Sequence, residues 1–420
     1  MAASQRIAPP ALTFKTLLVM VLAIRIAAHF ALSQPLQSDS LAYFTIAQHM
    51  AHGAWPADNF GQHAFYSIGY PALLAPFFAL FGASTTVAFG VNLALAVASA
   101  GLLALVVRAF APPPRREAVQ NLALLGYALW LPGVWNCTML ARENLSTPLI
   151  LLLVWIALRL LRAGGAHSGW ALGAGLASGA AVLTGTSALP LVGAPVLAIL
   201  LAARWRLQQA AAPLLALTLG GALALAPWLI ATDTMMGRPM LSTNTGFNLY
   251  LGNNPDATGR FVSIASTPAG PEWQAMRARM GEAGATGELG QRAINWIAHN
   301  PASAFRLAMI KLALFWAPNV PDAEDFALSP AIAMVRVGEV AQYLLFGALA
   351  VLGLGVASVA ADRRLVMLTA ITGFWLLHGV AYIIERYRDP VMPLLIVLAA
   401  SAWVDLARSL SVRKEAPHAA

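Results

Sequence analysis

Long apolar runs are the feature of this sequence that most limits how the chain can fold. A helix needs about 20 apolar residues to cross the hydrocarbon core of a bilayer, and such runs recur along the 420 residues. Only 10% of the residues are charged, against about a quarter in soluble domains. We therefore predict an all-α polytopic membrane protein with ten membrane-spanning helices, near 12–32, 85–109, 119–137, 145–162, 169–185, 187–203, 211–231, 337–358, 365–384 and 391–408.

The first apolar run is expected to stay in the protein as a helix. It is longer than the apolar region of a typical signal peptide and lacks a convincing small-residue cleavage site. Two other runs, 70–82 and 303–317, are too short to span, and the second carries Arg306 and Lys311. We expect both to form re-entrant or interfacial helices.

The distribution of charge indicates the orientation of the helices, because Lys and Arg collect on the cytoplasmic side. With the N-terminus inside, the cytoplasmic ends receive most of the basic residues, for example Arg115, Arg162 and Arg363. Most acidic residues then lie outside. We expect both termini in the cytoplasm and the working face on the outer side.

The expected spans divide the chain into three parts. Residues 1–231 form an N-terminal transmembrane module that includes a first outer loop at 33–84, and residues 337–420 form C-terminal helices with a cytoplasmic tail. Between them, 232–336 is too polar and too rich in Gly and Pro to span. We expect this long outer loop to form a small helical subdomain with an interfacial helix.

Several classes of site are excluded or disfavoured by composition. The single cysteine, Cys137, rules out a disulfide framework and a Cys-based metal or iron–sulfur site. His49, His52 and His63 lack a matching set of carboxylates at helical spacing, so we expect no metal site. Binding of a divalent ion is the alternative. No cofactor is required. The net charge is +8, but in a membrane protein Lys and Arg collect on the cytoplasmic side and set the orientation. The positive charge therefore gives little support to nucleic-acid binding.

The stretch SDSLAYFTIAQHMAHG, 38–53, places Asp39 at the outer mouth of the first span. Ser38 or Asp39 can cap the first turn of a helix, or Asp39 can serve chemistry. Tyr43 lies one turn further along the same helix face. Tyr43, His63, Tyr66 and Tyr70 are candidate acceptor or sugar contacts. For the last three, an interfacial aromatic belt is the alternative.

Other charged residues also lie at or within the spans. Glu143 is at a span mouth on the same side as Asp39, so the two carboxylates can share a site, or Glu143 can pair with Arg142 at the surface. Arg25 lies inside the first span, where a charge costs about 2.5 to 3.5 kcal/mol. It should face a polar cavity or partner, or reach the interface.

The stretch ERYRDPVMP, 385–393, supplies two arginines in a short outer connection. Alternation in an extended segment before a proline would point Arg386 and Arg388 to the same side. A pair of guanidiniums suits a phosphate, and pairing with Glu385 and Asp389 is the alternative. Lys311 can add positive potential.

The order of these motifs resembles that of the bacterial membrane glycosyltransferases of family 39. The resemblance covers nearly the whole chain and lies in SDSLAYFTIAQHMAHG, YSIGYPALLAPFFALFG, APWLI, GRPMLSTNTGFNLYLGNNPDATG and ERYRDPVMP. That family is similar to the protein O-mannosyltransferases and the aminoarabinose transferases, all of the GT-C fold. The chain departs from it at LTGTSALP, at Ala231 and Thr232, and at Ser67 and Ile68, which leaves the exact donor and acceptor open.

The resemblance implies an inverting transfer of sugar from a polyprenyl-phosphate donor to a hydroxyl of a lipid, glycan or protein acceptor. The family's essential acidic residue at the end of the first span corresponds to Asp39, and its second outer acidic residue to Glu143. The family's RYR element corresponds to Arg386, Tyr387 and Arg388, which with Lys311 are expected to bind the lipid phosphate.

The cellular location and two further candidate contacts complete the expectations. The resemblance implies a bacterial inner membrane with the site facing the periplasm. Asn248 and Tyr250, in the turn-rich stretch 244–259, are expected to contact the acceptor or sugar, or to belong to a structured loop only. The alternatives are a lipid or sugar transporter or flippase, and a non-catalytic envelope assembly protein.

Overall fold

The computed structural model describes residues 13–32, 35–163, 167–355 and 358–415. Within these ranges the chain is helical, and its β-structure is one isolated bridge between Arg260 and Ile383. The all-α fold class is confirmed. Residues 1–12 and 416–420, at the ends of the expected first and last parts, and residues 33–34, at the start of the expected first outer loop, lie outside the described residues.

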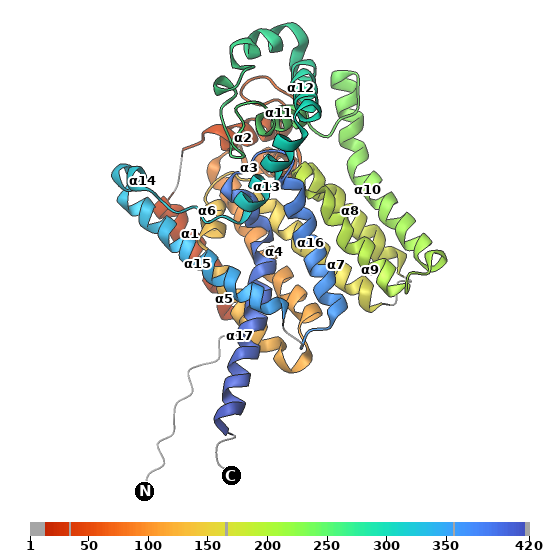
Figure 1. The fold of residues 1–420 in the computed structure, drawn as a ribbon, viewed down its shortest axis with the longest axis vertical. Coiled ribbons are helices and arrows are strands. Elements are labelled where there is room, and N and C mark those ends of the chain that lie inside the picture. Colours follow the sequence, from red (N-terminus) through yellow and green to blue (C-terminus); the bar gives the residue numbers. More distant parts are fainter. Residues whose placement is uncertain (1–12, 33–34, 164–166, 356–357, 416–420) are drawn as a thin grey trace.

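Six helices in the described part of the chain are long and apolar enough to cross a membrane. They are α1 (Phe14–Leu32), α4 (Thr85–Phe110), α7 (Glu143–Arg162), α10 (Leu207–Met236), α15 (Pro330–Leu354) and the run of η5 (Glu385–Val391) into α17 (Met392–Glu415). Figure 1 shows most of them running between the two ends of the molecule.

The other four expected spans are also helical, but they are shorter or interrupted. They form α5 (Arg116–Leu129) with α6 (Leu131–Cys137), α8 (Ser168–Thr184), η2 (Thr186–Val192) with α9 (Gly193–Ala202), and α16 (Ala361–His378). The expectation of one continuous helix over 119–137 is wrong, because Trp130 is extended and Pro132 opens a new helix. Pro190 lies in the 3-10 turn that begins the expected span at 187–203.

Backbone groups beside the break between α5 and α6 form hydrogen bonds with side chains of other helices. Gln342 of α15 accepts from the N–H of Leu131 at 3.0 Å and donates to the carbonyl of Leu129 at 2.8 Å. Arg25 of α1 donates to the carbonyl of Tyr127 at 3.4 Å, and its guanidinium lies 4.8 Å from the centre of that ring. Broken helices persist in a membrane only where such groups are paired. Arg25, which is fully buried, therefore faces the protein interior.

Most helices outside these spans gather at one end of the molecule, opposite the end at which α17 finishes, and α14 (Ala323–Leu328) lies apart at the start of α15 (Figure 1). Besides α14, these helices are α2 (Ser38–Ala51), α3 (Gly69–Phe81), α11 (Asn244–Gly252), η3 (Ile264–Ser266), η4 (Gly270–Glu272), α12 (Trp273–His299) and α13 (Pro301–Trp316). The single turn η1 (Pro113–Arg115) lies elsewhere, between α4 and α5. The short runs at 70–82 and 303–317 form α3 and α13.

Two helices run across the expected limits of the segment 232–336. α10 continues past residue 231 to Met236, where Gly237 ends it in the left-handed conformation. α15 begins at Pro330, a proline in the first helical turn, and continues past residue 336.

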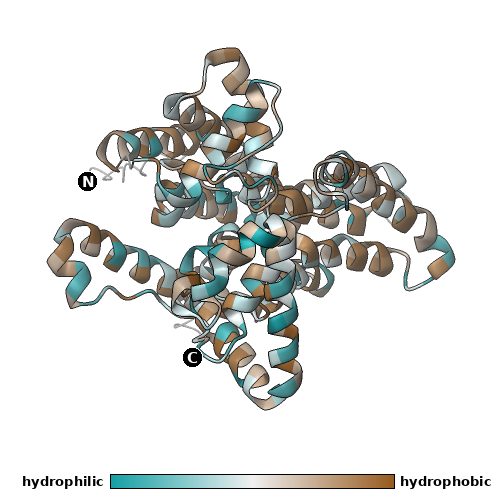
Figure 2. Cartoon of the chain, turned by 90° about the horizontal axis from the view of Figure 1, so that it is seen from above, coloured by the Kyte–Doolittle hydropathy of each residue, from teal (hydrophilic) through white to brown (hydrophobic). Residues whose placement is uncertain are grey.

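Hydrophobic residues recur along the peripheral helices, as the brown segments of Figure 2 show from above. On α10, Leu215, Leu219 and Leu223 follow each other at intervals of four residues and are 71%, 52% and 54% exposed. A stripe of this kind is unfavourable in water and suits contact with lipid. The fold is therefore that of a membrane protein.

Glycines allow α8 and α10 to approach closely. A Cβ on Gly175 would lie 2.0 Å from the carbonyl oxygen of Leu217, and one on Gly220 would lie 2.2 Å from that of Leu172. Small residues at such crossings bring backbones together, which supplies the packing that joins membrane helices.

We predict that Gly175→Ala destabilises the protein and that Gly173→Ala does not. The added methyl group at 175 would overlap backbone, whereas nothing lies within 4 Å of a Cβ at 173 on the same helix. Overpacking of this kind costs about 1–3 kcal/mol. Thermal unfolding in lipid nanodiscs measures both variants, and an equal effect would contradict the close contact.

Candidate active site

Asp39 lies in the first turn of α2, and its carboxylate forms an ion pair with Arg386 of η5. The expectation that Ser38 or Asp39 caps this helix is wrong. Gln37 occupies the N-cap position and makes no side-chain capping bond. Asp39 instead lies where the positive end of the helix dipole favours a carboxylate, with 28% of its side chain exposed.

Arg386 also contacts Glu143, so it joins two acidic residues from distant parts of the chain. Its Nε lies 3.9 Å from Oε1 of Glu143, which is 3.7 Å from Nε of Arg142. The Glu143 side chain is only 4% exposed. A charge removed from water in this way needs a partner of opposite sign. The structure therefore brings Asp39 and Glu143 together, with Arg386 between them.

The segment that carries Arg386 is a 3-10 helix and not the extended segment that was expected. With three residues per turn, residues two apart point in different directions. Arg388 accordingly points away from Asp39, to the carbonyls of Phe315 at 3.2 Å and Ala317 at 2.5 Å. It is 7% exposed. The expectation that both side chains point to the same side is wrong, although both residues line one cavity.

The acidic neighbours of these arginines have other partners. Glu385 pairs with Arg260 at 2.5 Å, and Asp389 accepts from Nδ2 of Asn136 at 2.9 Å. The expected alternative, in which Arg386 and Arg388 pair with Glu385 and Asp389, is therefore not what the structure has.

The segment before η5 is fixed by the chain that follows α11. The N–H of Ile383 donates to the carbonyl of Gly259 at 2.8 Å, and that of Phe261 to the carbonyl of Ile383 at 3.3 Å. The Arg260–Glu385 ion pair adds a side-chain contact to this bridge. Residues 259–261 thus position the turn that presents Arg386.

Aromatic rings surround the Asp39 end of α2. Tyr43 packs edge-on against Tyr66 and Tyr70, with ring centres 5.6 and 5.7 Å apart. Burial raises the pKa of Tyr66, and the negative charge of Asp39 raises it further. Tyr70 is fully buried and donates to Oδ1 of Asn92 at 2.7 Å. Tyr70, expected to contact a ligand, instead packs within the wall.

Tyr387 lies beside Arg142, whose guanidinium is 5.6 Å from the ring centre. The ring also packs against His378 at 5.3 Å. The sequence marked Arg142, like Arg386 and Arg388, as a candidate for function but gave it no specific role. Its place in a short outer connection, where arginine is unusual, was the signal in the sequence.

Three of the expected acceptor contacts hold other parts of the protein together. His63 donates its N–H to Glu282 at 2.7 Å, and its Nδ1 is 2.6 Å from the carbonyl of Pro56. Asn248 accepts from Tyr382 at 3.3 Å. Tyr250, 4% exposed, accepts from the N–H of Ala269 at 3.2 Å. Of the expected contacts, Tyr43 and Tyr66 are the ones placed beside Asp39.

Lys311 is buried in α13, and its ammonium donates to Asn253 at 2.9 Å and to the carbonyl of Val380 at 3.3 Å. Burial lowers the pKa of Lys311 to about 8. These contacts join α13 to two neighbouring segments. Lys311 does not line the cavity beside Arg386, contrary to its expected role at the phosphate.

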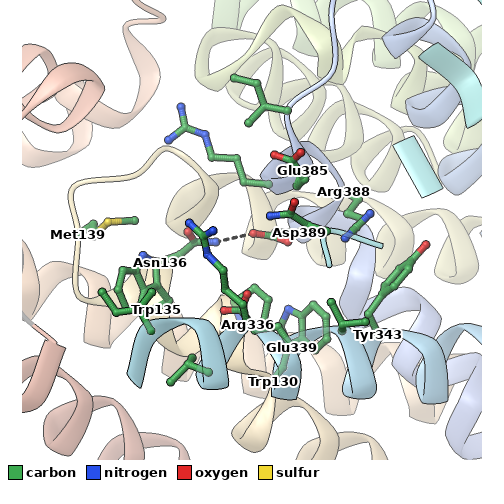
Figure 3. Close-up of a pocket in the computed structure, with 17 residues that line it drawn as sticks. Trp130, Trp135, Asn136, Met139, Arg336, Glu339, Tyr343, Glu385, Arg388 and Asp389 are labelled. Carbon is green, nitrogen blue, oxygen red and sulfur yellow. Dashed lines mark hydrogen bonds between the residues drawn. The ribbon is translucent and has the colours of Figure 1, made fainter. Parts of the chain in front are cut away.

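A cavity of about 250 Å³ lies between α6, α15 and η5 (Figure 3). This is larger than the roughly 150 Å³ of an apolar cavity that binds benzene. Its lining combines cations, carboxylates and aromatic rings: Arg336, Arg386, Arg388, Glu339, Asp389 and Trp135. Rings and convergent polar groups are typical of ligand sites.

Sequence reasoning missed the contribution of α15 to this cavity. Arg336, Glu339 and Tyr343 recur at helical spacing on the face that lines it. Charged residues within the first turns of an apolar helix were the available signal. Among the residues that the structure describes, no three His, Cys, Asp or Glu side chains are grouped to hold a metal ion.

We predict that Lys311 makes the free energy of unfolding rise with pH above about 8. Between the pKa of about 8 in the folded protein and the usual value of about 10.4, the unfolded chain holds more protons. Stability then rises by at most about 1.4 kcal/mol per pH unit.

The comparison with Lys311→Met isolates this effect. The difference in unfolding free energy between the natural protein and the variant should grow from pH 8 to pH 10, measured by chemical denaturation in detergent. A difference that stays constant over this interval would contradict the buried, hydrogen-bonded ammonium.

Comparison with known proteins points to one fold. No protein-family model matches the sequence, and no curated protein matches it. The structure is similar to the oligosaccharyltransferase AglB of Archaeoglobus fulgidus in complex with an inhibitory peptide and a dolichol-phosphate. The identity is 12% and the TM-score 0.53, over 97% of this chain and 52% of that one.

Two further structures were compared. The same archaeal enzyme tethered to an acceptor peptide aligns with 12% identity and a TM-score of 0.54, over 98% of this chain and 51% of that chain. ArnT of Cupriavidus metallidurans, bound to undecaprenyl phosphate, has 13% identity and a TM-score of 0.48, over 96% and 80% of the two chains.

This chain spans about half the length of the archaeal enzyme. At such low identity, the similarity to the archaeal enzyme establishes the fold and not the activity. The chain has the GT-C fold, as the order of its sequence motifs implied.

Proposed function

We propose that this protein is a membrane glycosyltransferase that uses a polyprenyl-phosphate sugar as donor and a hydroxyl of a lipid, glycan or protein as acceptor. The observation that carries the proposal is the cluster of Asp39, Arg386 and Glu143 beside a cavity lined by arginines and aromatic rings. The archaeal enzyme with this fold binds a dolichol-phosphate and an acceptor peptide. Both facts favour a lipid phosphate as part of the donor.

Asp39 is the better placed of the two carboxylates to act as the base. Its side chain is 28% exposed, whereas that of Glu143 is 4% exposed and lies between two arginines. In the proposed reaction the acceptor hydroxyl gives its proton to Asp39, and its oxygen attacks the anomeric carbon. The bond from that carbon to the phosphate oxygen breaks, and in-line attack inverts the configuration. Glu143 holds Arg386 in place.

Arg386 is placed to stabilise the departing phosphate. It lines the cavity and also contacts Asp39, so its guanidinium lies between the proposed base and the proposed donor site. A lipid phosphate leaves without a general acid, and cations that meet its developing charge lower the barrier. A phosphate that binds Arg386 also competes with Asp39 for the guanidinium, which frees the carboxylate to accept a proton.

Arg388 and Lys311 take supporting roles in this mechanism. Arg388 donates to the carbonyls of Phe315 and Ala317, and Lys311 to Asn253 and the carbonyl of Val380. These contacts anchor η5 and α13. The proposed phosphate site therefore centres on Arg386 and the cavity.

The proposed location is a bacterial inner membrane, with the site facing the periplasm. α2, α11 and α12 lie at the end of the molecule opposite the end of α17. Three arginines lie at helix ends elsewhere: Arg115 before α5, Arg162 at the end of α7 and Arg363 at the start of α16. Their sign suits the cytoplasmic side.

The activity is tested by mixing purified protein in liposomes with labelled polyprenyl-phosphate sugars and candidate acceptors. We predict that Asp39→Asn lowers the rate of transfer by about 100-fold or more, the usual contribution of a general base. Asp256→Asn, which changes an exposed carboxylate in the loop after α11, should leave the rate unchanged.

Thermal unfolding must show that the Asp39→Asn variant is folded. Full transfer by that variant would remove Asp39 from the mechanism. Absence of transfer by the natural protein from every donor, with movement of a lipid or sugar across the membrane, would favour a transporter instead.

A further inference from the structure

We propose that Arg336 of α15 binds the phosphate group of the lipid-linked donor. This inference rests on the proposed function, because it takes the donor to be a polyprenyl phosphate. It assigns a role to a helix that carries none of the motifs behind the family resemblance. Three arginines line the cavity, Arg336, Arg386 and Arg388, and they differ in their partners.

Arg388 is already committed to the protein. It is 7% exposed, donates to the carbonyls of Phe315 and Ala317, and lies 4.0 Å from the centre of the Tyr343 ring. Releasing it would leave buried carbonyls unpaired, which is unfavourable. Arg388 therefore supports the wall of the cavity.

Arg386 lines the cavity and also forms ion pairs with Asp39 and Glu143. These two carboxylates already offset the charge of the guanidinium, so Arg386 needs a second cation beside it to balance a bound phosphate. The donor is a phosphodiester with one negative charge, and the departure of the sugar leaves a phosphate monoester, which carries close to two negative charges at neutral pH. A second cation at the cavity would balance the second charge.

Arg336 is the cation that can be exchanged most easily. Its ion pair with Asp325 of α14 is 2.5 Å long, but the two side chains are 39% and 33% exposed. Exposed pairs contribute little to stability, so a phosphate can replace Asp325 at small cost.

Asp325 keeps other hydrogen bonds when Arg336 is removed from it. Its Oδ2 accepts from the N–H of Asp322 at 3.2 Å, as part of a capping box at the start of α14. The carboxylate is therefore not left unpaired, and α14 keeps its N-terminal cap.

The position of Arg336 on α15 suits a ligand that arrives from lipid. Arg336, Glu339 and Tyr343 line the cavity, whereas Met334 and Leu344 on the same helix are 60% and 53% exposed. Figure 3 shows Arg336 pointing into the cavity, toward Asn136 and Asp389. One face of an apolar helix thus meets lipid, and the other presents a planar pair of donors that matches a phosphate.

The inference is tested by binding alone. Full-length protein in nanodiscs is titrated with undecaprenyl phosphate that carries no sugar, and dissociation constants are measured for the natural protein and its variants. We expect Arg336→Gln to weaken binding by roughly tenfold or more, the scale of a charge-assisted hydrogen bond. Arg336→Lys should restore part of the affinity.

Two matched variants separate ligand binding from a structural role. Asp325→Asn removes the present partner of Arg336, so binding should be as tight as in the natural protein or tighter. Arg292→Gln breaks another exposed ion pair, with Glu272 at 3.1 Å, and should change nothing. Equal weakening by Arg336→Gln and Asp325→Asn would mean that Arg336 only holds α14, and would overturn the inference.

Other outcomes are equally decisive. Affinity that Arg336→Gln leaves intact overturns the inference and spares the proposed function, whereas absence of binding by the natural protein overturns both. Inorganic phosphate is titrated as a second ligand. If it binds as tightly as the lipid and is affected equally by Arg336→Gln, the site takes free phosphate, and the assignment to a lipid donor is wrong.

Discussion

The ion pair between Arg386 and Asp39, with Glu143 at the same guanidinium, is the interaction on which the candidate site depends. These residues come from η5, α2 and α7, which are far apart in the sequence. Charges that leave water must be paired, so the contact fixes the relative positions of the three segments. The bridge between Arg260 and Ile383 fixes the same turn from the other side.

Interrupted helices make room for the cavity beside this cluster. The break at Trp130 turns α6 away from α5, and the 3-10 turn of η5 delays the start of α17. The break at Trp130 exposes backbone groups, which Gln342 and Arg25 satisfy, and Arg388 of η5 satisfies carbonyls at the end of α13. Buried polar side chains within the apolar region thus serve the shape of the site, because an unpaired carbonyl in a membrane is strongly unfavourable.

The sequence was informative about helices and about charge at helix ends, and less so about the directions in which side chains point. The length of the apolar runs predicted the all-α fold, and the placement of Asp39, Glu143 and Arg386 at helix ends predicted that they meet. The sequence could not show that 385–391 is a 3-10 turn, which separates Arg386 from Arg388. It also could not show which cations are buried against carbonyls, as Lys311 is, or that Arg336 lines the cavity, because these depend on packing between distant helices.

A structure of the protein with a bound polyprenyl-phosphate sugar tests the central claim most directly. We predict that the phosphate lies in the cavity between α6, α15 and η5, within hydrogen-bond distance of Arg386, and that the anomeric carbon faces Asp39. A phosphate bound away from Arg386, for example near the apolar groove lined by Trp55 and Trp228, would contradict it.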